Sequence, residues 1–156
     1  MIHLSALSAA RPEQPTVLTV GAFDGVHLGH QALIRDMSAY ARANGMRSAV
    51  LTFYPHPSVV LNGRRPSFYI YRPAEKLSVF ETLGLDLAIT EPFSLALSKV
   101  SATDFVAQLQ RAHLAGGLQG QRMVVQGLGN VGYHAAKFLS EEDGVRVIAK
   151  IGRAHV

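Results

Sequence analysis

The sequence contains no cysteine. A disulfide framework and a cysteine-ligated zinc site are therefore excluded. It also lacks any apolar run near the ~20 residues that a membrane-spanning helix needs. The N-terminus is mildly apolar but has neither the basic start nor the long apolar core of a signal peptide. These absences favour a cytoplasmic protein with no membrane partner.

A strong excess of one charge is missing as well. Fifteen basic residues stand against 11 acidic ones, for a net charge of +4 in 156 residues. The basic side chains are scattered, and no cluster of them alternates with aromatic residues as in nucleic-acid-binding modules. We therefore expect no nucleic-acid partner, because small anionic ligands account for a mildly basic surface equally well. The 48% hydrophobic content is enough for the core of one domain.

The most informative segment, residues 21–30, reads Gly-Ala-Phe-Asp-Gly-Val-His-Leu-Gly-His. It follows the apolar run 16–20, which predicts a buried strand that ends at Gly21. From Gln31 onward, apolar residues recur at three- and four-residue spacing and predict a helix that stops near Asn44. The loop would thus lie at the carboxyl edge of a sheet, where open α/β folds bind ligands.

Histidine and glycine give this loop the chemistry of a phosphate site. His27 and His30 stand in the last loop residues or the first helical turn, on one side of the helix. The N–H groups of a helix N-terminus favour an anion, and two imidazoles add hydrogen-bond donors for phosphate oxygens. Gly21, Gly25 and Gly29 let the backbone approach a polyphosphate closely, which a side chain would block.

The segment resembles the FMN adenylyltransferase module of the bacterial bifunctional riboflavin kinase/FAD synthetase family, a branch of the HxGH nucleotidylyltransferases. Further blocks resemble the family in the same order, so the likeness covers about residues 15–110. These blocks are residues 51–57 (Leu-Thr-Phe-Tyr-Pro-His-Pro), 75–77, 83–86, 93–94 and 101–106. The resemblance implies a Rossmann-like, doubly wound parallel α/β sheet.

The resemblance also implies a reaction and a set of site residues. In this family the phosphate of FMN attacks the α-phosphorus of ATP, with Mg²⁺ present, to give FAD and pyrophosphate. His27 and His30 become the candidate catalytic residues, in contact with the ATP phosphates. His56 and Pro57 become candidate FMN contacts. The expected ATP and phosphate contacts are Gly21, Phe23, Asp24, Gly25, His27, Gly29 and His30.

Several of these residues have plainer interpretations. His27 and His30 could be ordinary loop histidines or two ligands of a metal, but a zinc site normally needs a third protein ligand, so we expect no metal site. Asp24 fits a simple turn residue before a glycine. His56 fits the end of a strand between two prolines. Lys76, which could bind phosphate, fits a solvated charge on a helix better.

The rest of the first two thirds alternates between strand and helix patterns. Such alternation predicts a parallel sheet of the doubly wound type. Expected elements are a strand or leader loop over 1–10, a strand over 48–53, a polar connection over 62–66, a helix over 73–83, a strand over 85–89 and a helix capped near Ser101.

A second phosphate-loop pattern follows further along the chain. A strand pattern over 122–126 leads into Gly127, Gly129 and Gly132, and a helical stretch comes next. Residues 113–149 resemble the start of the NAD-binding domain of glutamate dehydrogenase. This supports an alternative function, an NAD-binding oxidoreductase fragment or a non-catalytic nucleotide-binding module.

The dinucleotide site is incomplete, however. A ribose-binding acid is expected ~20 residues after the glycine loop, but residues 150–153 contain none. We therefore interpret Gly127, Gly129 and Gly132 as vestigial and expect weak or no NAD binding.

The two resemblances divide the chain into three parts. Residues 1–112 form the expected, incomplete adenylyltransferase domain, 113–150 a βαβ fragment, and 151–156 a tail that looks like the in-frame translation of a sequencing-library adapter. The later blocks of the adenylyltransferase module and the kinase domain do not follow, so we expect low turnover. The expected join lies near Gln110 to Leu114, and residues 116–120 are the best linker candidate. A natural fusion and a sequencing chimera both explain such a join. The pattern makes no prediction about oligomeric state.

Overall fold

The computed structural model describes residues 1–11, 13–63, 69–112, 114, 122–126 and 146–151. The chain divides into two compact units, Met1–Ala115 and Gly116–Val156. None of the described helices combines the length and the apolar character that a bilayer crossing requires.

The first unit is built on a four-stranded parallel sheet with the strand order β1-β4-β3-β2. The strands are β1 (Ile2–Leu4), β2 (Thr16–Val20), β3 (Arg47–Tyr54) and β4 (Leu87–Pro92). In register, Leu18 of β2 pairs with Ala49 of β3, and Ala49 pairs with Leu87 of β4. Because all strands are parallel, their carboxyl ends meet at one edge.

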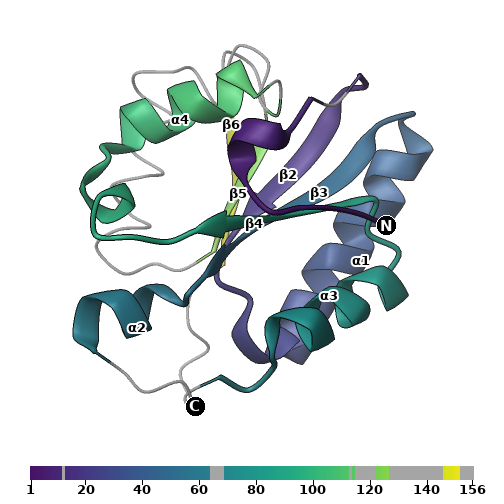
Figure 1. Cartoon of the computed structure of the whole chain (residues 1–156). Coiled ribbons are helices and arrows are strands. Elements are labelled where there is room, and N and C mark those ends of the chain that lie inside the picture. The colour runs from purple at the N-terminus through teal and green to yellow at the C-terminus, as the bar shows by residue number, and fades with distance from the viewer. Residues whose placement is uncertain (12, 64–68, 113, 115–121, 127–145, 152–156) are drawn as a thin grey trace. The chain divides into compact units, whose positions relative to one another are not determined.

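Helices cover both faces of this sheet. The helices are α1 (Leu28–Ala43), α2 (Pro57–Asn62), α3 (Pro73–Thr82) and α4 (Ala102–Arg111), with short 3-10 turns η1 (Leu7–Ala9), η2 (Asp24–Val26) and η4 (Leu97–Lys99). Figure 1 shows α1 and α3 on one side of the sheet and α4 on the other. The prediction of a doubly wound parallel α/β fold is therefore confirmed.

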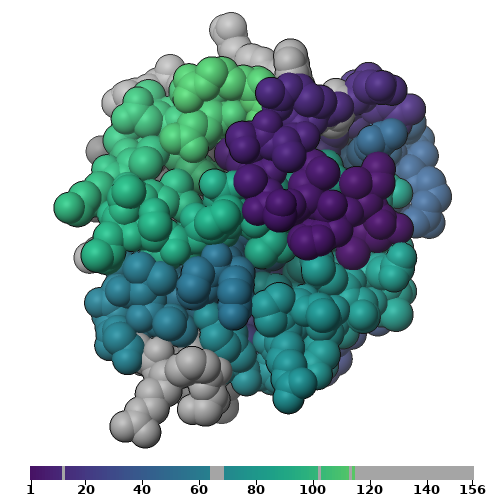
Figure 2. Space-filling model, viewed as in Figure 1, coloured from purple at the N-terminus to yellow at the C-terminus, as the bar shows by residue number. Residues whose placement is uncertain are grey.

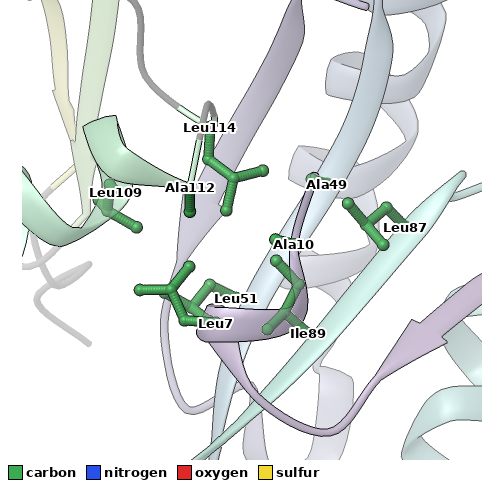
Figure 3. Packing of buried hydrophobic residues seen from close by; sticks show 9 residues of the cluster. All are labelled: Leu7, Ala10, Ala49, Leu51, Leu87, Ile89, Leu109, Ala112 and Leu114. Atoms are coloured by element: carbon green, nitrogen blue, oxygen red, sulfur yellow. The ribbon is translucent and has the colours of Figure 1, made fainter. Parts of the chain in front are cut away.

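Side-chain alternation along β3 separates the two halves of the core. Ala49 and Leu51 face the side of η1 and α4, where they pack with Leu7 and Leu109 (Figure 3). On the same side, the N-terminal segment lies beside α4 on the molecular surface (Figure 2). Val50 faces the other side, and its cluster also contains Phe23, Val26, Ile34, Met37, Phe80, Leu83, Leu85 and Ala88.

Three predicted elements differ from the structure. Helix α1 begins at Leu28 rather than at Gln31, so both signature histidines belong to its start. Strand β2 is half-buried rather than buried, because it pairs with β3 alone among the described strands. The strand expected at 85–89 is β4, which begins later because Asp86 turns its carboxylate back to the N–H and hydroxyl of Ser48, at 2.9 and 2.8 Å.

Other predicted elements are confirmed closely. Helix α3 begins at Pro73, as the pattern over 73–83 indicates. Helix α4 is capped by Ser101, whose hydroxyl accepts the N–H of Asp104 at 3.1 Å. Residues 57–62, for which the sequence predicts no helix, form α2.

In the second unit, β5 (Arg122–Gln126) and β6 (Arg146–Ile151) form a parallel pair. The predicted strand over 122–126 is thus present. Gly127, Gly129, Gly132 and the linker candidate over 116–120 lie outside the described residues.

Candidate active site

The signature loop leaves β2 at the carboxyl edge of the sheet and enters α1. The N–H of Gly21 donates to the carbonyl of Leu51 at 3.0 Å, which ties the start of the loop to the neighbouring strand. The loop then closes through η2, and the carbonyl of Val26 accepts the side-chain amide of Gln31 at 3.0 Å. The predicted position at the ligand-binding edge of an α/β sheet is therefore observed.

The loop contains an unusual run of backbone angles. Phe23, Gly25 and Val26 have φ values of 49°, 72° and 35°. This left-handed region costs a non-glycine residue free energy, so it persists where surrounding contacts hold it. At Gly25, an added Cβ would also lie 2.8 Å from Cε1 of His27 and from Cδ1 of Ile70. The geometry of the loop itself therefore favours glycine at this position. The close approach of Gly25 to a polyphosphate stays a prediction.

The structure brings the two signature histidines together. His27 occupies the N-cap position of α1 without a side-chain capping hydrogen bond, and His30 lies in the first turn. Their rings stack with centroids 5.6 Å apart and planes 26° apart. His27 and Gly29 are exposed, and His30 is half-buried. Among the described residues, nothing beyond the local backbone of α1 lies within 4 Å of a Cβ built on Gly29, so open space adjoins the helix start there.

His30 is embedded in an aromatic cluster that the sequence does not predict. Its ring lies 5.1 Å from the ring of Phe23 in a T-shaped contact, and Phe23 contacts Phe80 of α3 in the same way at 5.8 Å. Phe23 is 4% exposed, so the ring of His30 packs against a buried aromatic side chain. Burial lowers the pKa of His30 below 6.5, and the neighbouring His27 lowers it further. Within the described part of the chain, the buried Nδ1 of His30 has no hydrogen-bond partner.

Asp24 and His56 are joined through one short segment. Oδ1 of Asp24 accepts the N–H of Ile70 at 3.2 Å, and the hydroxyl of Tyr69 accepts the N–H of His56 at 2.8 Å. His56 also caps α2, since its Nδ1 accepts the N–H of Ser58 at 3.1 Å, and Pro57 is the first residue of that helix. The Pro-His-Pro segment therefore follows the end of β3 and starts a helix. The signature loop and this segment are thus linked at one sheet edge.

The prediction that Lys76 is a solvated charge is wrong. The residue is 9% exposed, and its Nζ donates to the carbonyl of Ala22 at 3.0 Å and to Oγ1 of Thr52 at 2.9 Å. A signal was present in the sequence: Lys76 precedes the apolar Phe80 by four residues and Leu83 by seven, so it shares their helix face.

Two other features of the described residues bear on ligand binding. No group of three His, Cys, Asp or Glu side chains in the described residues could hold a metal ion. A cavity of about 320 Å³ lies on the face of the sheet opposite α1, beside η1 and the end of α4. Arg11 and Glu91 are among the residues that line it. Arg11 there donates to the carbonyls of Ser8 and Ala10, so its charge serves the local backbone.

Comparisons with solved structures show the fold. A chain described as a macrolide-efflux protein from Streptococcus pneumoniae has a TM-score of 0.76 at 24% identity, covering 99% of this chain and 52% of that one. A pantoate-beta-alanine ligase from Francisella tularensis has a TM-score of 0.57 at 12% identity, covering 99% and 69%.

Sequence relatives point to one family more specifically than the solved structures do. Three proteins named bifunctional riboflavin kinase/FMN adenylyltransferase match this chain. That of Listeria monocytogenes is 43% identical over 91 residues, that of Bacillus subtilis 36% over 94, and that of Escherichia coli K12 30% over 103. The matches cover 58%, 60% and 66% of this chain, but only 29%, 30% and 33% of those relatives.

The family match covers most of the chain. A family model described as FAD synthetase matches residues 9–128, which include the signature loop, Lys76 and three of the four strands of the first sheet, β2, β3 and β4. The match continues past the boundary that the sequence predicts near residue 112. The resemblance of residues 113–149 to glutamate dehydrogenase stays a prediction. The sequence match, the parallel fold and the paired histidines agree: this chain belongs to the FAD synthetase family.

Proposed function

We propose that this chain is an FMN adenylyltransferase module, which transfers AMP from ATP to FMN. The observation that carries the proposal is the stacked pair His27 and His30 at the start of α1, on the ligand-binding edge of the sheet, in a member of the FAD synthetase family. The relatives named FMN adenylyltransferase support the same activity. The alternative of an NAD-binding fragment has no comparable support.

In this proposal the ATP phosphates lie over the exposed start of α1. Open space beside Gly29 and the exposure of His27 leave room for a polyphosphate there. Backbone N–H groups at the helix start and the two imidazoles donate hydrogen bonds to phosphate oxygens. His30 is held by the aromatic cluster, so its ring is oriented before ATP arrives.

The chemistry requires positioning and charge stabilisation rather than a covalent intermediate. A phosphate oxygen of FMN bonds to the α-phosphorus of ATP, and the bond from that phosphorus to the bridging oxygen breaks. Pyrophosphate leaves with the electron pair of that bond. Imidazole and N–H donors stabilise the charge that develops on the leaving phosphates.

The FMN side of the site is assigned to the segment after β3. Because β2 and β3 are neighbouring parallel strands, His56 and Pro57 follow a strand end next to the one that carries the ATP loop. FMN placed there would have its phosphate beside the α-phosphorus of ATP. The link through Tyr69 and Ile70 holds the two segments at a fixed separation.

Magnesium enters with ATP as the MgATP substrate. Mg²⁺ usually keeps several waters and is held by substrate phosphates together with one or two carboxylates. Asp24 is the carboxylate of the signature loop, although one of its oxygens already accepts the N–H of Ile70. The substrates, small anionic nucleotides, and the family of enzymes both fit a cytoplasmic location.

The extent of the module is also a proposal. We assign the adenylyltransferase to residues 1–112 and treat 113–150 and 151–156 as pieces of other origin, although the family match runs on to residue 128. An independent long-read sequence of the source DNA across codons 105–156 tests this. A frame that continues into further adenylyltransferase blocks would make the last third spurious, and a confirmed join followed by a stop would make the fusion real.

The test of the activity combines binding and turnover on the full chain. MgATP binding is measured by isothermal titration calorimetry, and FAD formation from FMN and MgATP by chromatography. We expect MgATP to bind, FAD to form slowly, and the variant His27→Ala with His30→Ala to lose both. His3→Ala is the matched control, because this histidine lies on β1 and contacts Thr90 instead.

Gly29→Ala gives a sharper test, since it separates the site from the fold. The added methyl meets open space, and alanine is favoured over glycine in a helix by about 0.5–1 kcal/mol. We expect equal or higher stability in urea but weaker MgATP binding, because the methyl occupies the space assigned to phosphate. Unchanged MgATP affinity in both this variant and the double histidine variant would refute the site.

A further inference from the structure

A buried lysine lies beneath the signature loop. Lys76 stands near the start of α3, where Pro73 begins the helix and Glu75 accepts the N–H of Arg72 at 2.8 Å. From there its side chain reaches the start of the loop, and the residue is 9% exposed. A lysine is rarely this buried unless its charge is paired or used.

The ammonium belongs to a closed set of three hydrogen bonds. It donates to the carbonyl of Ala22 at 3.0 Å and to Oγ1 of Thr52 at 2.9 Å. The hydroxyl of Thr52 itself donates to the same Ala22 carbonyl at 2.9 Å. Thr52 is fully buried in β3, so this carbonyl is held from two sides by groups of two different elements.

Burying this ammonium without a paired carboxylate costs free energy of folding. Among the described residues, one ion pair lies within 4.0 Å, and it joins the N-terminal ammonium to Glu81. Lys76 therefore has no carboxylate partner at this distance in the described part of the chain. Asp24 is the carboxylate whose charge acts on it from the loop. A buried cation without a paired carboxylate is unfavourable unless hydrogen bonds and a nearby anion compensate it. The anion expected at this loop is the polyphosphate of ATP.

The carbonyl that Lys76 holds lies next to the part of the loop with left-handed backbone angles. Ala22 directly precedes the run of left-handed backbone angles at Phe23, Gly25 and Val26. Such a run needs outside contacts to persist. A fixed Ala22 carbonyl anchors the point from which the chain turns toward His27. Phe23, the next residue, also supports the ring of His30.

We propose that Lys76 is a positioning residue for ATP: together with Thr52 it holds the Ala22 carbonyl and thereby sets the loop and the two histidines in the conformation that receives the phosphates. This inference rests on the proposed function, because it names how the same ATP site is kept in shape. Lys76 acts through the loop and need not touch the nucleotide.

The experiment compares two pairs of variants in the full chain. Lys76→Met removes the ammonium and keeps most of the length, and Lys99→Met removes an exposed lysine as its control. Thr52→Val removes the hydroxyl with little change in volume, and Thr52→Ser restores it. MgATP affinity is measured by calorimetry, and KM for ATP, KM for FMN and kcat are measured for FAD formation, on samples checked for folding by circular dichroism.

We expect Lys76→Met and Thr52→Val to weaken MgATP binding about tenfold or more, the range for a lost charge-assisted hydrogen bond. KM for ATP should rise in parallel, and KM for FMN should stay within about twofold of wild type, because a raised KM reports lost binding of the substrate concerned. Thr52→Ser should recover most of the affinity, and Lys99→Met should behave as wild type. If Lys76 were only structural, its replacement would lower the stability of the protein and leave KM for ATP unchanged.

The outcomes separate this inference from the proposed function. If wild type binds MgATP and folded Lys76→Met binds it equally well, the positioning role is refuted and the proposed function stands. If Lys76→Met does not fold, the pair Thr52→Val and Thr52→Ser decides: equal affinity in the two refutes the role. If wild type binds no MgATP, the proposed function fails, and the inference fails with it.

Discussion

The buried ammonium of Lys76 should make the stability of this protein depend on alkaline pH. Burial lowers the pKa of Lys76 from its ordinary value of 10.5 to about 8, and the charge of Asp24 partly opposes this. Between these two pKa values the unfolded chain binds more protons than the folded one. The free energy of unfolding therefore rises with pH in this window. The cost of burying the charge is fully present below about pH 8 and is relieved toward pH 10.5.

The magnitude follows from the size of the shift. One pKa unit corresponds to about 1.4 kcal/mol, so a shift from 10.5 to about 8 amounts to roughly 3 kcal/mol in full. Between pH 7 and pH 10, wild type should gain about 2–3 kcal/mol of stability relative to Lys76→Met, which lacks the titrating group. Tyrosines and other groups titrate in both proteins, so their contributions cancel in this comparison.

The assay is urea denaturation followed by circular dichroism at pH 7, 8, 9 and 10, without nucleotide. The measured quantity is the difference in free energy of unfolding between wild type and Lys76→Met at each pH. Lys99→Met serves as the control, because an exposed lysine should give a difference that does not change with pH. A difference between wild type and Lys76→Met that stays constant within about 0.5 kcal/mol, the usual scatter for surface substitutions, would refute the burial of the charge.

Two further predictions concern the loop. Gly25→Ala should destabilise the protein by more than Gly45→Ala: both glycines have positive φ, which costs alanine about 1–2 kcal/mol, but only Gly25 also crowds His27 and Ile70 at 2.8 Å. Equal losses of stability in urea would show that the crowding is relieved freely. Wild type should also lose stability relative to His30→Gln as pH falls from 7.5 to 5.5. Because the folded pKa of His30 lies below 6.5, the unfolded chain binds the proton more readily there. Parallel pH curves for the two proteins would contradict the lowered pKa.

Local patterns in the sequence were sufficient for much of the fold. The strand over 16–20, the helix from Pro73 and the Ser101 cap follow from apolar spacing and from capping chemistry, both of which involve neighbouring residues. The pairing of His27 with His30 follows in the same way, since residues three apart on a helix start face the same side. These interactions are short-range, so the order of residues is enough to predict them.

Contacts between distant segments decided the rest. The strand order β1-β4-β3-β2, and with it the half-exposed β2, depends on how strands separated by whole helices pair. The burial of Lys76 depends on Ala22 and Thr52, which lie 54 and 24 residues away in the chain. A lysine on a helix is ordinarily solvated because hydration of its charge outweighs burial. Here two acceptors from other elements compensate the lost hydration, and that compensation exists only once the sheet and its loops have assembled.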